Sequence, residues 1–128
     1  MQAYDESRAL RFYLFDHCPE LLTPEERLIV RDARLGRSIL AYKEGGEPRL
    51  AVMLGRKLHD PEFASLDEQA LDAREMSLAR AVLARVGDEV VQRCGRCGRI
   101  LNTPRAQQCF LCGHDWHKKA GGPAPASG

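Results

Sequence analysis

The chain has 128 residues, of which 44% are hydrophobic and 29% are charged, a balance typical of one soluble globular domain or of two small ones. No stretch approaches the ~18 apolar residues that a membrane span requires. The first residues include acidic side chains where a signal peptide has basic ones. We therefore expect a cytoplasmic protein without a membrane partner, in a compartment where cysteines stay reduced.

Charge is distributed unevenly along the chain. Residues 1–91 contain 13 basic and 17 acidic residues, which gives a net charge of −4. Residues 92–119 contain six basic residues and one acidic residue, which gives +5. This asymmetry is compatible with an anionic partner for the basic segment, and equally with docking of that segment on the acidic part of the same chain.

The N-terminal two thirds of the sequence predict helices. Asp5 can cap a first segment, although its aromatic run at 12–15 would also fit a short buried strand. Pro19 should end that segment. Thr23-Pro24-Glu25-Glu26 is a clearer start, because it combines a threonine N-cap, a proline in the first turn and the glutamate of a capping box.

The helix that begins at Pro24 should extend to about Glu44, where Gly45-Gly46 ends it. After Pro48, leucines recur every four residues and favour another helix. The alternative is a hairpin across the two glycines, with strands at 39–42 and 50–54. We expect the inner side of the first of these helices to contain Leu28, Ile29, Ala33, Leu35 and Ile39.

The most regular helical pattern covers residues 67–86 and ends at Gly87. Asp60-Pro61 supplies a further start signal before it, and Val90-Val91 predicts a short strand after it. One face of the 67–86 helix contains its apolar side chains, namely Leu71, Leu78, Ala79, Val82, Leu83 and Val86.

Two cysteine pairs near the C-terminus carry the most specific signal. Cys94 and Cys97 form one CxxC-Gly turn, Cys109 and Cys112 form a second, and eleven residues separate Cys97 from Cys109. Four thiolates delivered in this way can complete a tetrahedral shell around one Zn²⁺, and the glycine after each pair can adopt the positive φ that the bend needs. We predict one closed, structural zinc site, with iron, redox-active pairs or free thiols as alternatives.

Other residues near the cysteines are weaker candidates for a role. His114 or His117 could replace one cysteine as a metal ligand, but four cysteines make this unnecessary. Cys18 is more easily explained as a buried thiol between two helices than as a nucleophile. Trp116 is expected to cover the zinc turns rather than to stack on a base.

These patterns predict an α+β protein with a mostly α N-terminal module and a small C-terminal β zinc ribbon. The helical module should cover residues 1–89, the ribbon 90–119 and a disordered tail 120–128. The oligomeric state is open. No phosphate-binding glycine loop, carboxylate pair or catalytic triad is recognisable, so we do not expect an enzyme.

The segment from Cys94 to His117 resembles the four-cysteine zinc-ribbon ending of small uncharacterised bacterial proteins. The shared elements are the two CxxCG turns, the Thr103-Pro104-Arg105-Ala106 turn and the closing Asp-Trp-His, together about a fifth of the chain. The resemblance implies the four cysteines as metal ligands. Zinc ribbons more broadly occur in transcription and translation proteins, where they contact nucleic acid, polymerase or ribosomal partners.

The first functional hypothesis is therefore a cytoplasmic adaptor or regulator whose basic ribbon binds nucleic acid, RNA rather than a DNA base sequence. The alternative is a protein–protein interaction module in which the zinc ribbon is purely structural and docks on a protein or on its own helices. Phosphate contacts in the first hypothesis would come from Arg93, Arg96, Arg99, Arg105, Lys118 and Lys119.

Overall fold

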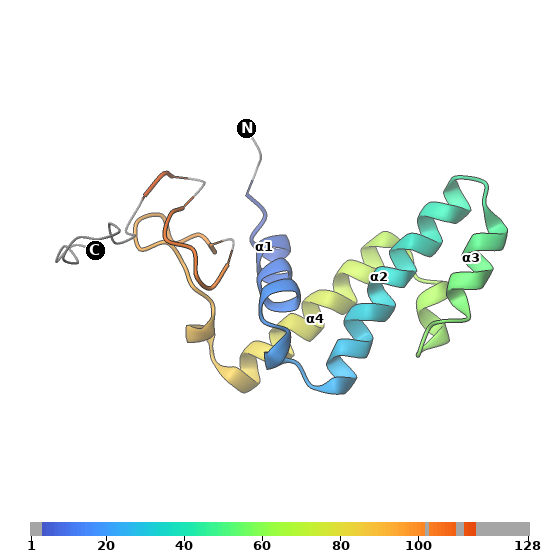
Figure 1. The fold of residues 1–128 in the computed structure, drawn as a ribbon, viewed down its shortest axis with the longest axis horizontal. Coiled ribbons are helices and arrows are strands. Elements are labelled where there is room, and N and C mark those ends of the chain that lie inside the picture. The colour runs from blue at the N-terminus through green and yellow to red at the C-terminus, as the bar shows by residue number, and fades with distance from the viewer. Residues whose placement is uncertain (1–3, 102, 110–111, 115–128) are drawn as a thin grey trace, which may run out of the picture. The chain divides into compact units, whose positions relative to one another are not determined.

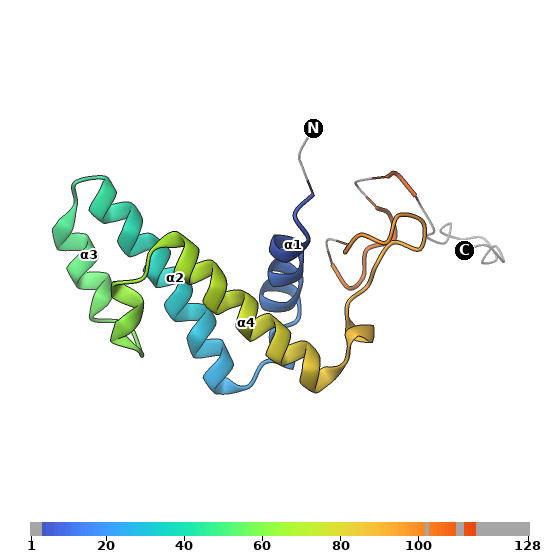
Figure 2. The same cartoon turned by 180° about the vertical axis from the view of Figure 1, so that it is seen from behind.

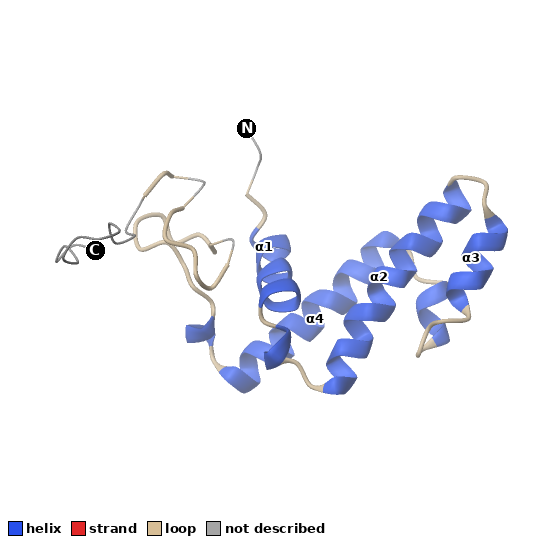
Figure 3. Ribbon diagram, in the orientation of Figure 1, coloured by secondary structure: helices blue, strands red, loops and turns tan. Residues whose placement is uncertain are grey.

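The computed structural model describes residues 4–101, 103–109 and 112–114 (Figure 1). The chain divides into two compact units, one made of Met1–Cys18 together with Gly87–Gly128 and the other of Pro19–Val86. We call the first the end unit and the second the helical unit. Most of the described residues are helical, as predicted, and Figure 3 shows no strand among them. None of the described helices combines the length and the apolar character that spanning a membrane needs.

The helical unit begins with α2 (Pro24–Glu44), whose start is the predicted capping box. The backbone N–H of Glu26 donates to Thr23 Oγ1 at 3.1 Å, and the backbone N–H of Thr23 donates to Glu26 Oε1 at 2.8 Å. Both of these otherwise unpaired donors at the helix start are thereby satisfied. The helix ends at Gly45, and Gly46 turns the chain with a φ of 77°.

The next helix, α3 (Pro48–Gly55), confirms the helical alternative over the hairpin. A single 3-10 turn (Pro61–Ala64) follows, and Asp60 caps it by accepting a hydrogen bond from Glu62 N at 3.0 Å. The unit closes with α4 (Glu68–Val86), and Gly87 ends this helix with a φ of 94°. The proline signals thus predicted the starts of α2, α3 and the 3-10 turn, and the glycine signals predicted the ends of α2 and α4.

The core of the helical unit lies where α2 and α4 pack side by side in opposite directions (Figures 1 and 2). Ala33, Phe63 and Leu71 are completely buried at its centre. The predicted inner sides are partly confirmed, because about half of the predicted residues are only half-buried, namely Leu28, Ile29, Leu35, Leu83 and Val86. The sequence did not predict the burial of Val30 and Gly36.

Two buried acidic side chains also shape this unit. Asp32 is only 1% exposed, and its carboxylate accepts hydrogen bonds from the backbone N–H groups of His59 at 3.0 Å and Asp60 at 2.8 Å. It thereby ties the loop after α3 to the middle of α2. Glu75 on α4 is paired with Arg37 on α2 at 2.6 Å.

The end unit starts with α1 (Glu6–Phe12), which continues as a π-helical turn (Tyr13–His17). Asp5 caps it as predicted, accepting a hydrogen bond from Arg8 N at 3.1 Å. The aromatic run is therefore helical and not a strand. Tyr13 and the two residues after it are buried.

The C-terminal part of the end unit is mostly loop. The predicted strand at Val90–Val91 is wrong, since Asp88–Val90 forms a 3-10 turn and Val91 alone is extended. Between Arg93 and Ile100 there is an isolated antiparallel bridge, and the described residues form no longer ladder. The tail predicted at 120–128 lies outside the described residues.

The two compact units group the residues differently from the predicted modules 1–89 and 90–119. Residues up to Cys18 cluster with Gly87 and the residues after it, and not with α2–α4. Whether the two predicted modules fold independently stays a prediction, because compactness alone does not measure folding cooperativity.

Candidate metal centre

The two CxxC-Gly turns have the same backbone construction. Gly98 N donates to the carbonyl oxygen of Cys94 at 2.8 Å, and Gly113 N donates to that of Cys109 at 2.8 Å. These glycines have φ values of 76° and 79°, in the left-handed region that L-residues avoid. The positive φ predicted from the sequence is therefore confirmed at both positions.

The first cysteine of each turn is held by a second matching bond. Cys94 N donates to Arg99 O at 2.9 Å, and Cys109 N donates to His114 O at 2.8 Å. Each turn therefore closes on the residue just after its glycine. This local closure leaves both cysteine side chains of a turn free to point to the same side.

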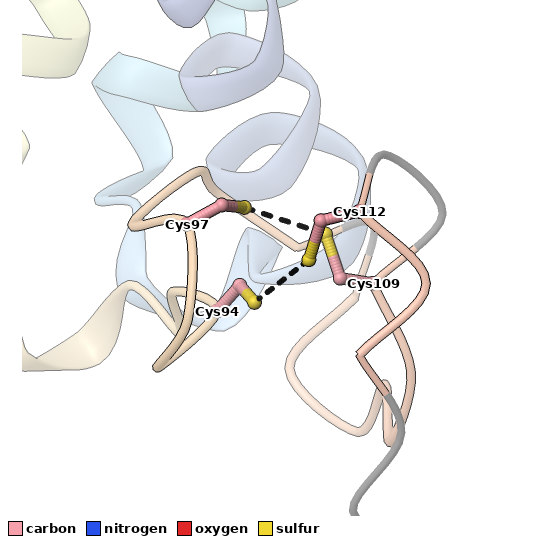
Figure 4. A group of neighbouring side chains, drawn as sticks. All are labelled: Cys94, Cys97, Cys109 and Cys112. Carbon is pink, nitrogen blue, oxygen red and sulfur yellow. Dashed lines mark hydrogen bonds between the residues drawn. The ribbon is translucent and has the colours of Figure 1, made fainter.

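The four sulfur atoms meet between the two turns (Figure 4). All four lie within 4.8 Å of one another, with 3.6 Å between the Sγ atoms of Cys94 and Cys112 and 3.7 Å between those of Cys97 and Cys109. A tetrahedron with Zn–S bonds of about 2.3 Å has edges of about 3.8 Å. The cysteines are thus positioned to bind one metal ion.

The acidity of the thiols differs across the group. Burial acts to raise the pKa of Cys94, but hydrogen bonds from the backbone N–H groups of Cys97 and Arg96, together with those of the Cys112 and Cys97 thiols, lower this pKa to about 6. For Cys112, a backbone hydrogen bond from His114 lowers the pKa, whereas desolvation and the neighbouring thiols raise it to about 11. Four sulfurs this close do not all ionise without a compensating cation, which a divalent metal ion supplies.

The weaker ligand candidates do not join this group. His114 lies next to the second turn, but its imidazole is not among the atoms that cluster within 4.8 Å. Cys18 is buried, and its thiol is also outside the cluster. His117 and Trp116 lie outside the described residues.

The N-terminal segment supports the first turn through Tyr4 and Glu6, which the sequence did not single out. Ile100 N donates to Tyr4 Oη at 3.0 Å, and Tyr4 Oη donates to the Glu6 carboxylate. That carboxylate pairs with Arg93, whose Nη1 also donates to Gly98 O at 3.0 Å. These contacts therefore connect Arg93, just before the first turn, to Ile100, which follows it.

Tyr13 supports the segment that leads into the same turn. Its side chain is 1% exposed, and its hydroxyl donates to Val90 O at 2.9 Å and accepts from Gln92 N at 3.0 Å. Gln92 in turn donates through Nε2 to Ala106 O at 3.1 Å. The only sequence signal for this role was a tyrosine within an apolar helical run, which is more typical of ordinary core packing.

The arginines predicted to contact nucleic acid fall into two classes, those that contact the N-terminal segment and those that do not. The first class comprises Arg93 and Arg99. Arg93 forms two hydrogen bonds with the Glu6 carboxylate, at 2.6 and 3.2 Å, which hold the pKa of Glu6 below its ordinary value. The guanidinium of Arg99 lies over the ring of Tyr4, 5.4 Å from its centroid.

The second class comprises Arg96 and Arg105, which are exposed and form no ion pair within the described part of the chain. The remaining two predicted contacts, Lys118 and Lys119, lie outside the described residues.

Comparison with protein-family models, curated proteins and solved structures gives no match to this chain.

Proposed function

We propose that this protein is a protein–protein interaction module whose zinc site is purely structural. The observation that carries the proposal is the engagement of Arg93 by Glu6 and of Arg99 by Tyr4. Arg93 and Arg99 could each bind a phosphate group, but here they contact the N-terminal segment of the same chain. Such self-docking was one of the two explanations for the uneven charge.

Zinc is the metal we propose, as a single ion held by Cys94, Cys97, Cys109 and Cys112. Four thiolates fill a tetrahedral shell and leave no open position for a substrate, which supports a structural role. The metal would stabilise a β zinc ribbon over 90–119 that has few apolar side chains of its own. Metal analysis should find one equivalent of zinc in a colourless protein, whereas an iron–thiolate site would absorb visible light.

Nucleic-acid binding is the second candidate, favoured by the exposed side chains of Arg96 and Arg105. The pair between Arg93 and Glu6 is also exposed, with side-chain exposures of 45% and 51%. Such pairs contribute about 1 kcal/mol or less, so a phosphate group could displace the carboxylate. The partner in this case would be single-stranded RNA.

A binding assay with fluorescent single-stranded RNA separates the two candidates. If the proposed function is correct, neither the wild type nor Glu6→Gln should retain the RNA near physiological ionic strength. If the protein binds nucleic acid, its affinity for RNA should fall as salt is added. The plot of log affinity against log salt concentration should have a slope of about 0.7 in magnitude per phosphate contact. In that case Glu6→Gln should tighten binding by releasing Arg93, and changing Arg96 and Arg105 to alanine should flatten the slope.

RNA retention with this pattern would overturn the proposed function and leave the nucleic-acid candidate in its place. The choice of a partner within the transcription or translation machinery, and a cytoplasmic location, remain predictions from the sequence. Zinc ribbons that contact such machinery are known on many unrelated proteins, so this support is analogy at the level of fold.

A further inference from the structure

The helix α3 has apolar side chains on two sides, although it packs on only one. Ala51 is buried against the rest of the helical unit, and α2 is the main neighbour of α3. On the other side, Val52 is 57% exposed and Met53 is 55% exposed. Figures 1 and 2 show α3 at the outer edge of the helical unit in both views.

This exposure is unusual for a helix whose apolar residues run consecutively from Leu50 to Leu54. A helix that is apolar on all sides is normally buried. Runs of exposed apolar residues weaken solubility and commonly mark an interaction site. A shallow depression of about 400 Å³ lies on the exposed side, lined by Pro48, Arg49, Val52, Met53 and Arg56.

Charge distinguishes this face from a plain apolar patch. Arg49 precedes the two exposed apolar residues by about one turn and Arg56 follows them by about one turn, so all four share one face at i, i+3, i+4 and i+7. Neither arginine forms an ion pair within the described ranges, in contrast to Arg37, Arg74 and Arg85 of the same unit. An apolar centre is therefore bordered by two cations at its ends.

We propose that this α3 face, defined by Arg49, Val52, Met53 and Arg56, docks an amphipathic helix of another protein. The partner helix would place an apolar stripe on Val52 and Met53 and carboxylates opposite the two arginines. Methionine suits such a surface because its flexible thioether adapts to different apolar side chains. This inference rests on the proposed function and names the partner class of the interaction module.

The same charges argue against a second copy of this chain as the occupant. In a two-fold symmetric contact between α3 faces, Arg49 of one copy would approach Arg56 of the other. Like charges placed opposite each other across an interface oppose association. Acidic residues on the partner resolve this conflict, whereas self-association does not.

The test uses the zinc-loaded full chain and two fluorescent helical peptides. Both peptides have leucines at i, i+3, i+4 and i+7, one with glutamates and one with lysines beside them. The wild type should bind the glutamate peptide and not the lysine peptide. Exchanging Arg49 and Arg56 for glutamate should weaken binding of the glutamate peptide at least tenfold and should create binding of the lysine peptide.

Two further variants control this test. Val52→Asp together with Met53→Asp should abolish binding of the glutamate peptide, because charge replaces the apolar centre. Arg80→Glu changes the charge at an exposed position on α4 and should leave binding unchanged. All the substituted side chains are exposed, so thermal unfolding should stay close to that of the wild type.

Several results would overturn the inference. These are no binding of the glutamate peptide, equal binding of both peptides, or binding to anionic phospholipid vesicles alone. A dimer in sedimentation that the Val52 and Met53 changes dissociate would make the face a self-interface instead. Failure of the peptide to bind, with no RNA retained either, would remove this surface while leaving the proposed function standing.

Discussion

At the scale of single residues, Tyr13 makes the connection between the N-terminal helix and the segment that enters the first cysteine turn. Its hydroxyl serves as donor to Val90 and as acceptor for Gln92, both within 3.0 Å. The tyrosine side chain is buried, so these two backbone groups depend on its hydroxyl for their hydrogen bonds. The hydroxyl therefore supports the first cysteine turn without belonging to the cysteine cluster.

Tyr13→Phe should lower the free energy of unfolding of the end unit by about 1–3 kcal/mol, because it leaves a partly buried donor and acceptor without the hydroxyl. Urea titration with a chromophoric chelator measures this as zinc release at a lower urea concentration. Tyr42→Phe is the matched control, since Tyr42 is exposed and its hydroxyl has no hydrogen bond among the described residues. Equal shifts for both variants would contradict the role of Tyr13.

At the scale of elements, the start of α2 combines a capping box with an ion pair to the end of α4. Arg85 donates through both Nη atoms to the two oxygens of Glu26, each at 2.7 Å. These bonds hold the pKa of Glu26 below its usual value of 4.5. A carboxyl whose pKa is lowered by folding adds stability above its unfolded pKa and loses it as the pH falls.

Glu26→Gln should therefore destabilise the helical unit at neutral pH, while the amide keeps the capping box. The difference from the wild type should shrink as the pH falls below 4.5 through the lower folded pKa. Chemical unfolding at several pH values measures it. Glu25→Gln, at an exposed neighbour, should show no such pH-dependent difference. A constant difference for Glu26→Gln at every pH would contradict the argument.

Gly36 sets how closely the helices of the same unit approach. A Cβ built at Gly36 would lie 2.9 Å from Leu71 Cδ2 and 3.0 Å from Phe63 O. One of these neighbours is backbone and the other is a completely buried side chain, so neither yields easily. The glycine is therefore required by packing, although it is a poor helix former.

Gly36→Ala should destabilise the helical unit by about 1 kcal/mol, because overpacking costs more than helix propensity gains. Gly55→Ala is the matched control, as no atom lies within 4 Å of its added Cβ. That change should be neutral or stabilise the protein by up to about 1 kcal/mol. Thermal unfolding of both variants measures these changes in stability. If Gly36→Ala stabilised the protein, the neighbouring side chains would have to relax around the added methyl group, and the packing argument would be wrong.

At the scale of the whole molecule, the chain consists of an end unit that contains the four-cysteine cluster and a helical unit with its own apolar core. The three longest α-helices all belong to the helical unit. Burial of Ala33, Phe63 and Leu71 does not involve the cysteines. The two units should therefore respond differently to loss of the metal.

Zinc chelation, or Cys97→Ser, should unfold the end unit while most of the far-UV helical signal remains. Hydrogen exchange should become fast at the amides of Gln92 and Ile100, which depend on the tyrosine hydroxyls. Amides within α2 and α4 should keep their protection. Loss of protection in both units together would show that they share one folding unit and that no boundary separates α4 from the cysteine turns.

Local patterns in the sequence were sufficient to predict the α-helices and the cluster of four cysteines. The capping residues Asp5 and Thr23 act within four residues of their own position, and each CxxC-Gly turn is closed by bonds over five residues. Such short-range geometry depends little on the rest of the fold. The same reasoning failed at Val90, where β-branched side chains suggested a strand but no partner strand is present among the described residues.

The sequence by itself therefore determined the helix starts, the glycines that end α2 and α4, and the four cysteines whose sulfur atoms come together. Only the tertiary structure decided which distant residues serve them, such as Tyr4 and Tyr13 beside the cysteine turns and Asp32 beneath the loop after α3. The physical reason is the range of the interactions. A cap or a tight turn is specified by neighbours in the chain, whereas a hydroxyl or carboxylate that reaches across tens of residues finds its partner only once the helices have packed.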